Sequence, residues 1–332
     1  MKLYFRPIEG DWAVRTGYGA QYEAFLSNVP QSGNGYSIVT EPANADYIIH
    51  PPGDHLTMAP VGRLLRPLSR LDVRSFAWDS NDGPTGRRSG FYCSLPRQLF
   101  EPERHCSISY PIPFNELVDA APASDALRDF GFMGNQTSGV RARMLQWFAA
   151  DGGKYNGVIT EGTYGSDWNV LFQRDGSEPK QRYARFLRET KFVVCPRGFG
   201  VGTVRMFEAM QAGRVPVILS DGYVMPNGID WDSCSLRIAE IDFRRIPEVV
   251  EANLHRWPQM AANALAVWQR HFSNTGVIQY LADNLRRLEQ TASPSLGRSL
   301  AYSGKVAAAL AEAKARPTLG RLAAVVRSGL RG

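Results

Sequence analysis

Residues that could bind phosphate and sugar groups are concentrated between Lys191 and Pro226, which reads KFVVCPRGFGVGTVRMFEAMQAGRVPVILSDGYVMP. Its apolar start ends at Cys195-Pro196 and is typical of a buried parallel strand. Three alternating glycines then precede a helix that opens at Thr203: Gly198, Gly200 and Gly202. Gly213 is placed to end that helix in the left-handed conformation, before a second buried strand at 215–219. The pattern predicts a βαβ unit whose glycine loop offers backbone amides and a helix N-terminus to a phosphate.

Two charged residues, Arg205 and Glu208, lie three positions apart on the first turns of this helix, and Arg197 precedes the glycines. We expect Arg205 to neutralise a diphosphate and Glu208 to accept hydrogen bonds from ribose hydroxyls. The alternative is a solvated i,i+3 pair on the helix surface. The spacing G-x-G-x-G is not the dinucleotide fingerprint G-x-G-x-x-G, and it is not a P-loop because no Gly-Lys-Ser/Thr follows.

Short apolar runs alternate with segments of helical period along the chain, which is the pattern of an α/β protein. Strands are expected at 2–5, 47–50, 73–78, 129–133, 155–160, 191–195 and 215–220. Helices are expected at 21–26, 56–71, 138–150, 179–190, 203–212, 247–255, 258–272 and 276–290, with long loops and a few short strands over 79–113. The length of 332 residues suggests two domains. We predict an N-terminal domain over 1–125, a C-terminal domain over 126–275, and helices with a tail over 276–332.

The segment at 191–226 resembles the nucleotide-sugar site of the exostosin family of glycosyltransferases. The shared positions are Lys191-Phe192, Pro196, Gly198, Arg205, Glu208-Ala209, Gly213, Val215-Pro216-Val217, Ser220-Asp221 and Pro226. Two earlier segments resemble the same family in the same order. They are Asn44-Ala45-Asp46-Tyr47-Ile48-Ile49-His50-Pro51, and Phe132-Met133-Gly134-Asn135 followed by Gly139-Val140-Arg141. The resemblance therefore covers about residues 44–226.

The resemblance implies a GT-B architecture, in which two Rossmann-like domains face each other across a cleft, with the donor in the C-terminal domain and the acceptor in the N-terminal one. It also implies an inverting transfer from a UDP-sugar. Retaining enzymes of this architecture often carry two glutamates eight residues apart, but here Gly200 stands eight residues before Glu208, which favours inversion. The expected donor site comprises Gly134, Asn135, Arg141, Arg197, Gly198, Gly200, Gly202, Thr203, Arg205 and Glu208.

A metal site is not expected, although Asp230-Trp231-Asp232 has the spelling of a D-x-D motif. It follows the nucleotide unit, and turn formation beside Asn227-Gly228 is the alternative interpretation. Arginines and helix dipoles can stabilise a leaving diphosphate, so we expect neither a metal nor another cofactor.

A direct displacement needs a general base from the facing domain. Asp54, His55 and Asp82 are the candidate bases, with His50 and Asp79 beside them in the clusters HPPGDH and DSNDGP. Both clusters follow predicted strands, but loops rich in glycine and proline also use Asp and Asn simply to turn. The sequence does not choose between them.

The net charge of +6 belongs to the tail. Its basic residues outnumber the single acid Glu312 and account for the whole excess: Arg298, Lys305, Lys314, Arg316, Arg321, Arg327 and Arg331. No nucleic-acid partner is therefore expected for the body. Leu319, Leu322, Val326 and Leu330 share one helical face, so we expect either a basic amphipathic helix on an anionic membrane surface or a helix packed on the body.

Four scattered cysteines without a C-x-x-C, and no apolar run of membrane-spanning length, lead us to expect a cytoplasmic protein, peripheral at the inner face of the membrane if the tail binds there. The function expected from the resemblance is inverting transfer from a UDP-sugar to a glycan or glycolipid in cell-surface polysaccharide synthesis. The alternatives are a non-catalytic relative that binds a nucleotide-sugar or glycan, and a sugar-nucleotide epimerase of similar architecture.

Overall fold

The computed structural model describes residues 1–8, 18–51, 74–80, 82, 86, 88–111, 115–150, 153–160 and 178–291, together with 302, 304–306 and 308–309. The predicted helix at 56–71, the candidate bases Asp54 and His55, and the amphipathic stripe of the tail lie outside these residues. None of the helices within these ranges is long and apolar enough to cross a bilayer.

The N-terminal domain is built on a sheet with the strand order β2-β3-β1-β4-β5-β6-β7. Its strands are β1 Lys2–Phe5, β2 Ser32–Gly33, β3 Tyr36–Ile38, β4 Tyr47–His50, β5 Ser75–Asp79, β6 Gly90–Tyr92 and β7 His105–Ser107. Only the short β2–β3 pair is antiparallel, and neither of those strands was predicted. Helix α2, Tyr18–Asn28, follows β1 and packs Phe25 edge-on against Trp78 of β5 at 5.9 Å.

The C-terminal domain has a second sheet, entirely parallel, in the order β12-β11-β10-β8-β9. Its strands are β8 Arg128–Met133, β9 Gly157–Thr160, β10 Thr190–Pro196, β11 Val215–Leu219 and β12 Leu236–Arg237. Its helices are α4 Gly139–Ala149, α6 Glu178–Arg188, α7 Val204–Gln211, α8 Ile246–Asn253 and α9 Trp257–His271. The described residues also form short 3-10 turns at Pro42–Asn44, Arg97–Leu99, Ala123–Asp125, Trp231–Ser233, Glu240–Arg245 and Leu254–Arg256.

Helices cover both faces of the second sheet, which explains why β10 and β11 are apolar throughout. Because side chains alternate along a strand, Phe192 and Val194 of β10 pack with α4 and α8, whereas Val193 and Cys195 pack with α6, α7 and α9. The prediction for Gly213 is confirmed: it follows α7 with φ of 67°, in the left-handed region that glycine adopts without strain.

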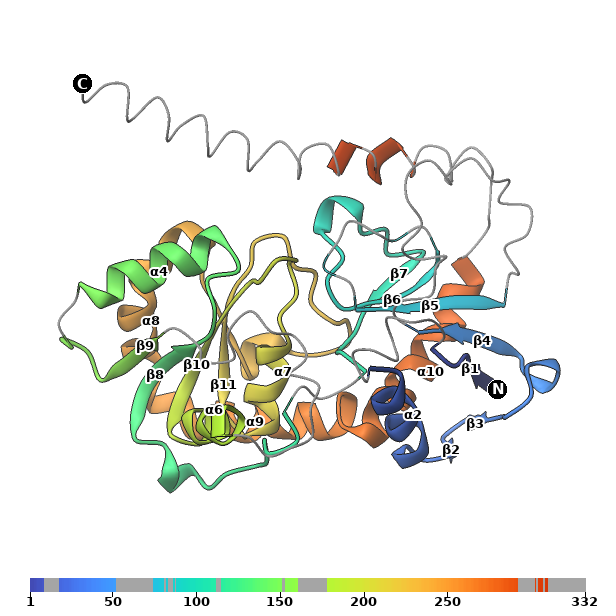
Figure 1. Ribbon diagram of the computed structural model, residues 1–332, viewed down its shortest axis with the longest axis horizontal. Helices are drawn as coiled ribbons and strands as arrows, with labels where there is room; N and C mark the ends of the chain where they lie inside the picture. The colour runs from blue at the N-terminus through green and yellow to red at the C-terminus, as the bar shows by residue number, and fades with distance from the viewer. Residues whose placement is uncertain are drawn as a thin grey trace.

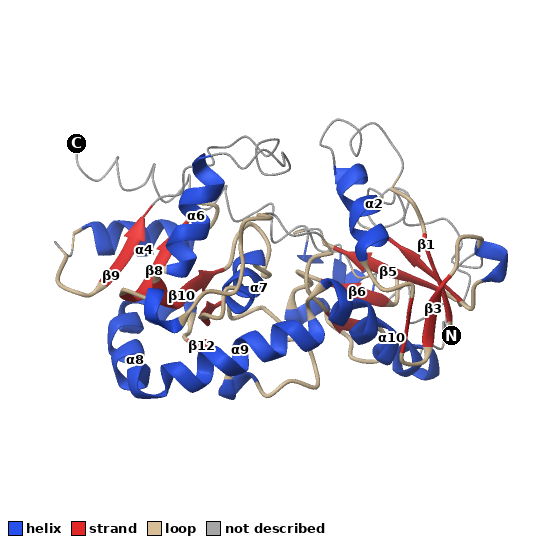
Figure 2. Cartoon of the chain, turned by 90° about the horizontal axis from the view of Figure 1, so that it is seen from below, coloured by secondary structure: helices blue, strands red, loops and turns tan. Residues whose placement is uncertain are grey.

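The chain crosses between the domains twice. The first crossing runs from Ser107 to Arg128, and the second lies at the junction between α9 and α10, Asn274–Thr291. Helix α10 returns to the first domain, where Ile278, Leu281 and Leu285 enter the core beneath β1, β4 and β5. Figures 1 and 2 show α9 and α10 running from one domain to the other along one side of the molecule. The order of elements agrees closely with the predicted one, and the two Rossmann-like domains face each other.

A candidate nucleotide-sugar site between the domains

The expected donor site lies where β8 and β10 end side by side. These strands are parallel neighbours, and the helix after β8, α4, covers one face of the sheet whereas the helix after β10, α7, covers the other. This change of side is a topological switch point, where ligands bind in open α/β sheets. Ser138 joins the two loops: it caps α4 through the amide of Arg141, and its hydroxyl donates to the carbonyl of Arg197 at 2.9 Å.

Two arginines meet at this point over the ring of Phe132. The guanidinium of Arg205 lies 4.6 Å from the ring centroid and that of Arg141 lies 5.5 Å from it. Arg205 donates to the carbonyl of Met133 at 2.8 Å. Arg141 donates from Nη2 to the carbonyl of Pro196 at 3.1 Å and from Nη1 to the carbonyl of Asn135. Only 8% of the surface of each arginine is exposed.

The two guanidinium groups of this buried pair repel each other. Burial, and then the proximity of Arg205, lower the pKa of Arg141 to about 9. Glu208 interacts electrostatically with Arg205, and its pKa is raised by burial despite the hydrogen bond from Tyr183 at 2.8 Å. Buried charges are costly unless they are paired. Two like charges held together in this way indicate a site for an anion.

Two buried polar atoms point to the same conclusion. Arg205 Nε and Thr137 Oγ1 have no hydrogen-bond partner among the residues that the structure describes. A Cβ built on Gly198 would lie 3.6 Å from Thr137 Oγ1 and 3.5 Å from Arg141 Nη2, so Gly198 borders both groups. Buried donors are normally satisfied, and an anion at this position would satisfy them.

The alternative of a solvated surface pair is wrong for Arg205 and Glu208, because both side chains are buried and Glu208 bonds Tyr183. Arg141 is likewise buried, whereas Arg143, two residues on, is exposed. Arg197 and Thr203 also belong to the expected donor site. Arg197 forms an ion pair with Glu240 at 3.0 Å, and Thr203 stands at the N-terminus of α7 without a side-chain cap.

The last two glycines of the loop face the N-terminal domain. A Cβ at Gly200 would overlap the hydroxyl of Ser94 and the carboxyl of Asp82, and one at Gly202 would overlap the carbonyl of Cys93. The amide of Gly202 donates to Ser94 Oγ at 2.9 Å. The structure therefore gives this amide a protein partner, although we expected it to face a phosphate. Gly134 is also a position of close approach, because a Cβ there would overlap Arg205.

Among the candidate bases in the described ranges, Asp82 is the one that reaches the glycine loop. Much of its surface is exposed, yet its carboxyl group faces Ser94 and the amide of Gly200. Loss of hydration there raises the pKa of Asp82, against the opposing effects of Ser94, Arg141 and Gly200. Asp79 and His50 are buried at the ends of β5 and β4.

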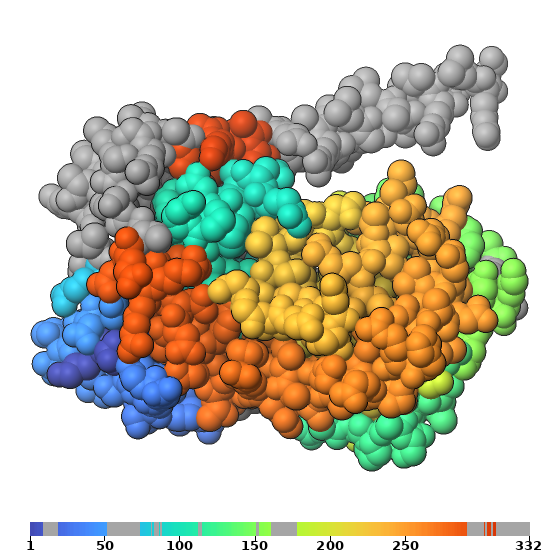
Figure 3. All heavy atoms as spheres, turned by 180° about the vertical axis from the view of Figure 1, so that it is seen from behind, coloured from blue at the N-terminus to red at the C-terminus, as the bar shows by residue number. Residues whose placement is uncertain are grey.

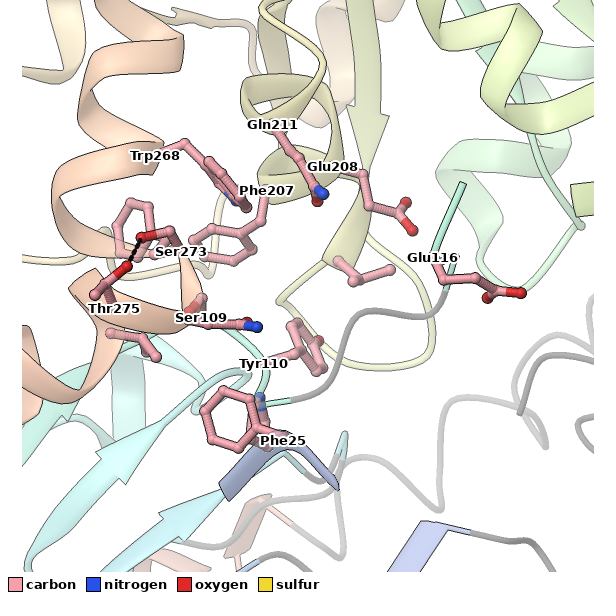
Figure 4. A pocket seen from close by; sticks show the side chains of 15 residues that line it. Phe25, Ser109, Tyr110, Glu116, Phe207, Glu208, Gln211, Trp268, Ser273 and Thr275 are labelled. Atoms are coloured by element: carbon pink, nitrogen blue, oxygen red, sulfur yellow. Dashed lines mark hydrogen bonds between the residues drawn. The ribbon is translucent and has the colours of Figure 1, made fainter. Parts of the chain in front are cut away.

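A cavity of about 420 Å³ opens beside Glu208, between α7 and the first domain. Both chain crossings line it, the first through Ser109–Pro111 and Glu116 and the second through Phe272–Thr275. Figure 4 shows the aromatic rings of Phe25, Tyr110, Phe207 and Trp268 around this space, with Glu208 and Glu116 toward one end. Tyr110 connects the cavity to the base, because its hydroxyl bonds Ser94, which bonds Asp82.

Sequence reasoning missed several of these residues. Tyr183, Phe207 and Trp268 have the spacing of ordinary helix core residues, and Ser94 and Thr137 carry no motif. The D-x-D segment lies apart: Asp230 and Asp232 are exposed, and the Asp230 carbonyl accepts a hydrogen bond from Ser233 in a 3-10 turn. Within the described parts of the chain, no group of three or more His, Cys, Asp or Glu residues could hold a metal ion.

Two facing Rossmann-like domains, with a terminal helix that crosses back to the first, define the GT-B architecture. The buried pair Arg141 and Arg205 lies at the switch point of the second domain, where ligands bind in open α/β sheets. Residues 100–253 match the family described as Exostosin GT47 domain. The matched residues include Arg141, Arg205, Glu208 and the glycine loop but not the earlier segment at 44–51.

Individual relatives are similar over part of their length. The Exostosin-1 homolog of Caenorhabditis elegans is 30% identical over 139 residues, covering 40% of this chain and 36% of that protein. The probable glucuronoxylan glucuronosyltransferase IRX7 of Arabidopsis thaliana is 30% identical over 136 residues, covering 40% of this chain and 28% of that protein. The chain thus matches about a third of the length of these curated relatives. A solved structure of Anabaena Alr3699/HepE in complex with UDP covers 86% of this chain and all of its own, at 10% identity and a TM-score of 0.47.

Proposed function

We propose that this protein is a glycosyltransferase that moves a sugar from a UDP-sugar to a glycan or lipid-linked glycan with inversion at the anomeric carbon. The observation that carries the proposal is the buried pair Arg141 and Arg205 at the switch point, with a free Nε on Arg205 within the described structure. The donor diphosphate would lie on these guanidinium groups and on the N-terminus of α7, whose dipole favours negative charge.

The rest of the donor would extend from this point in two directions. Glu208 stands one turn further along α7 than the diphosphate position and would accept hydrogen bonds from the ribose hydroxyls. The transferred sugar would lie near Gly198 and Gly200, which border Arg141 on one side and Asp82 on the other. The choice of uridine rests on the exostosin resemblance.

The chemistry would be a single displacement. The acceptor hydroxyl attacks the anomeric carbon and its proton passes to the Asp82 carboxylate, while the bond from that carbon to the β-phosphate oxygen breaks and UDP leaves with the electron pair. A raised pKa suits Asp82 to this task, because a base is most effective when its pKa is near the working pH. Gly200 stands where a retaining enzyme would carry its first glutamate, which supports inversion.

The acceptor would enter through the cavity beside Glu208. Aromatic rings offer flat apolar surfaces on which sugar rings can lie, and Gln211, Ser273 and Thr275 offer polar groups for hydroxyls. Tyr110 and Ser94 connect this cavity to Asp82. An acceptor in a growing cell-surface polysaccharide is the role that we infer from the resemblance.

The experiment that tests the proposal is a measurement of UDP release from a set of UDP-sugars, with and without added oligosaccharides. Donors are first selected by thermal shift, because binding to the native state raises its apparent stability. Acceptor-dependent release supports transfer. Donor binding without release for any acceptor would favour a non-catalytic relative, and absence of any nucleotide binding would contradict the proposal.

Substitution of Glu208 by glutamine tests the ribose position. The amide keeps the shape of the side chain and an oxygen for the Tyr183 hydroxyl, but it accepts ribose hydroxyls more weakly than a carboxylate. We expect the wild type to bind UDP about tenfold more tightly than 2′-deoxy-UDP, since one charge-assisted hydrogen bond contributes about 1.5 kcal/mol or more. In the variant this preference should largely disappear, as measured by calorimetry. An unchanged preference would place the ribose elsewhere.

Activity is expected to persist in EDTA. Arg141 and Arg205 would neutralise the charge that develops on the leaving diphosphate, together with the helix dipole of α7, so the site has its own source of positive charge. The check is the rate of UDP release after dialysis against EDTA. If UDP release is lost completely in EDTA and Mn²⁺ or Mg²⁺ restores it, this prediction is wrong. Asp230 and Asp232 would then be the candidate metal ligands.

A further inference from the structure

A helical segment at 302–309 packs on the first domain and contacts Gly86, four residues after Asp82. Tyr302 and Val306 each have 1% of their surface exposed, and they form a small apolar cluster with Ala77, Tyr92, Leu95 and Leu99. The red segment in Figures 1 and 3 lies beside β6, β7 and the 3-10 turn at Arg97–Leu99. This segment follows α10 along the chain but belongs to a cluster separate from that of α10.

Tyr302 is held on several sides. Its hydroxyl donates to the carbonyl of Leu99 at 3.0 Å, and the guanidinium of Arg104 lies 4.7 Å above its ring. The ring of His105 lies 5.5 Å away. One turn on, Lys305 forms an exposed ion pair with Glu101 at 2.8 Å. The burial of Tyr302 and Val306, and not the ion pair, accounts for most of the stabilisation.

Tyr302 and His105 both contact Gly86, which lies on the same connection between β5 and β6 as Asp82. The backbone of Gly86 has φ of 93°, and a Cβ there would overlap the Tyr302 hydroxyl, so the two are in close contact. His105 Nδ1 accepts a hydrogen bond from the amide of Glu101 at 2.9 Å. The proton of the neutral ring is therefore on Nε2, which donates to the Gly86 carbonyl at 2.7 Å. Burial lowers the pKa of His105 to about 3, which keeps the ring neutral.

Asp82 thus lies between two fixed points of one connection. Its start is held at Asp79, whose carbonyl accepts from the amide of Cys93 at 2.9 Å, and Gly86 is held by His105 and Tyr302. We propose that Tyr302, with His105, is a positioning residue for Asp82: the C-terminal segment clamps the connection that presents the base to the glycine loop. The inference rests on the proposed function, but the clamp itself is a property of the fold.

The test compares Tyr302→Ala with Tyr302→Phe in the full-length chain, with Lys305→Ala as the matched control in the same segment. Tyr302→Ala should lower kcat for sugar transfer at least tenfold and change the Kd for UDP less than twofold. The phenylalanine variant, which keeps the buried ring against His105 and so keeps the residue that bonds Gly86, should recover most of kcat. Lys305→Ala should behave as the wild type. Greater access of water to Asp82 lowers its pKa, so the acidic limb of the kcat profile should move to lower pH in Tyr302→Ala.

Hydrogen exchange provides a readout that needs no activity. In Tyr302→Ala, the amides of Asp82 and Gly86 should exchange at least tenfold faster, while those of β8 and β10 should keep wild-type protection. Unchanged exchange of these amides in Tyr302→Ala would contradict the positioning role of Tyr302. A wild-type kcat and pH profile in the same variant would also contradict it. A general loss of protection would show unfolding, and Tyr302→Phe then decides the matter: it must retain both protection and kcat. Failure of the wild type to transfer sugar would instead contradict the proposed function.

Discussion

Replacing Arg205 by methionine should weaken UDP binding by roughly 10- to 100-fold, because a charge-assisted hydrogen bond contributes about 1.5–3 kcal/mol and each 1.4 kcal/mol is tenfold. In the buried cation pair, Arg205 has an Nε that no described residue bonds, and its guanidinium lies over the ring of Phe132. Methionine can fill the same space over the ring without carrying charge. Removal of one of two like charges also relieves the repulsion that acts on Arg141, so the free energy of unfolding should change little.

The measurement is a titration of UDP by calorimetry, with the thermal midpoint of each protein recorded alongside. Arg143→Met is the matched control, because Arg143 is an exposed arginine in the neighbouring helix α4. It should bind UDP as the wild type does. Equal affinities for Arg205→Met and the wild type would mean that the buried pair is structural and that the donor binds elsewhere.

Replacing Asp82 by asparagine should reduce kcat for transfer by about 10²- to 10⁴-fold, the range that general base catalysis typically contributes. The amide preserves the size of the side chain and a contact with Ser94, but it cannot take the acceptor proton. Binding of UDP should stay within a few-fold of the wild type, because the diphosphate position is defined by Arg141 and Arg205. Asp119→Asn, an exposed carboxylate in the first crossing, is the control and should leave kcat unchanged.

The pH dependence of the wild type provides a second check on Asp82. The base acts as a carboxylate, so kcat should fall as the pH falls through its pKa. Burial raises that pKa, and the acidic limb should therefore lie above the pH at which an ordinary aspartate titrates. In Asp82→Asn this limb should be absent from the residual rate. A retained limb, or a retained rate, would assign the base to another residue.

The second domain could be predicted almost element by element, because its signals are local. Apolar runs at 191–195 and 215–219 are too continuous for a half-exposed strand, and the glycines between them mark where the chain turns. Arg205 and Glu208 could be selected for the same reason, since they lie three positions apart on one helix. Gly213 could be placed because only the left-handed conformation ends the helix there.

The contact between Arg141 and Arg205 depends on the order of the strands, because β8 and β10 are neighbours in space although α4, β9 and α6 separate them in sequence. The choice of Asp82 among the candidate bases required the contact of the two domains at Gly200, where Ser94 also takes the amide of Gly202.

The α/β alternation, the glycine loop and the residues on the first turns of α7 could be predicted from the sequence, since these follow from periodicity and from backbone preferences within about a dozen residues. Only the tertiary structure decided which charges are buried together, which carboxylate reaches the glycine loop, how the two crossings enclose a cavity, and that Tyr302 lies on Gly86. These features arise from contacts between residues that are distant in sequence. Their energies depend on burial and on packing across domains, and no local pattern encodes them.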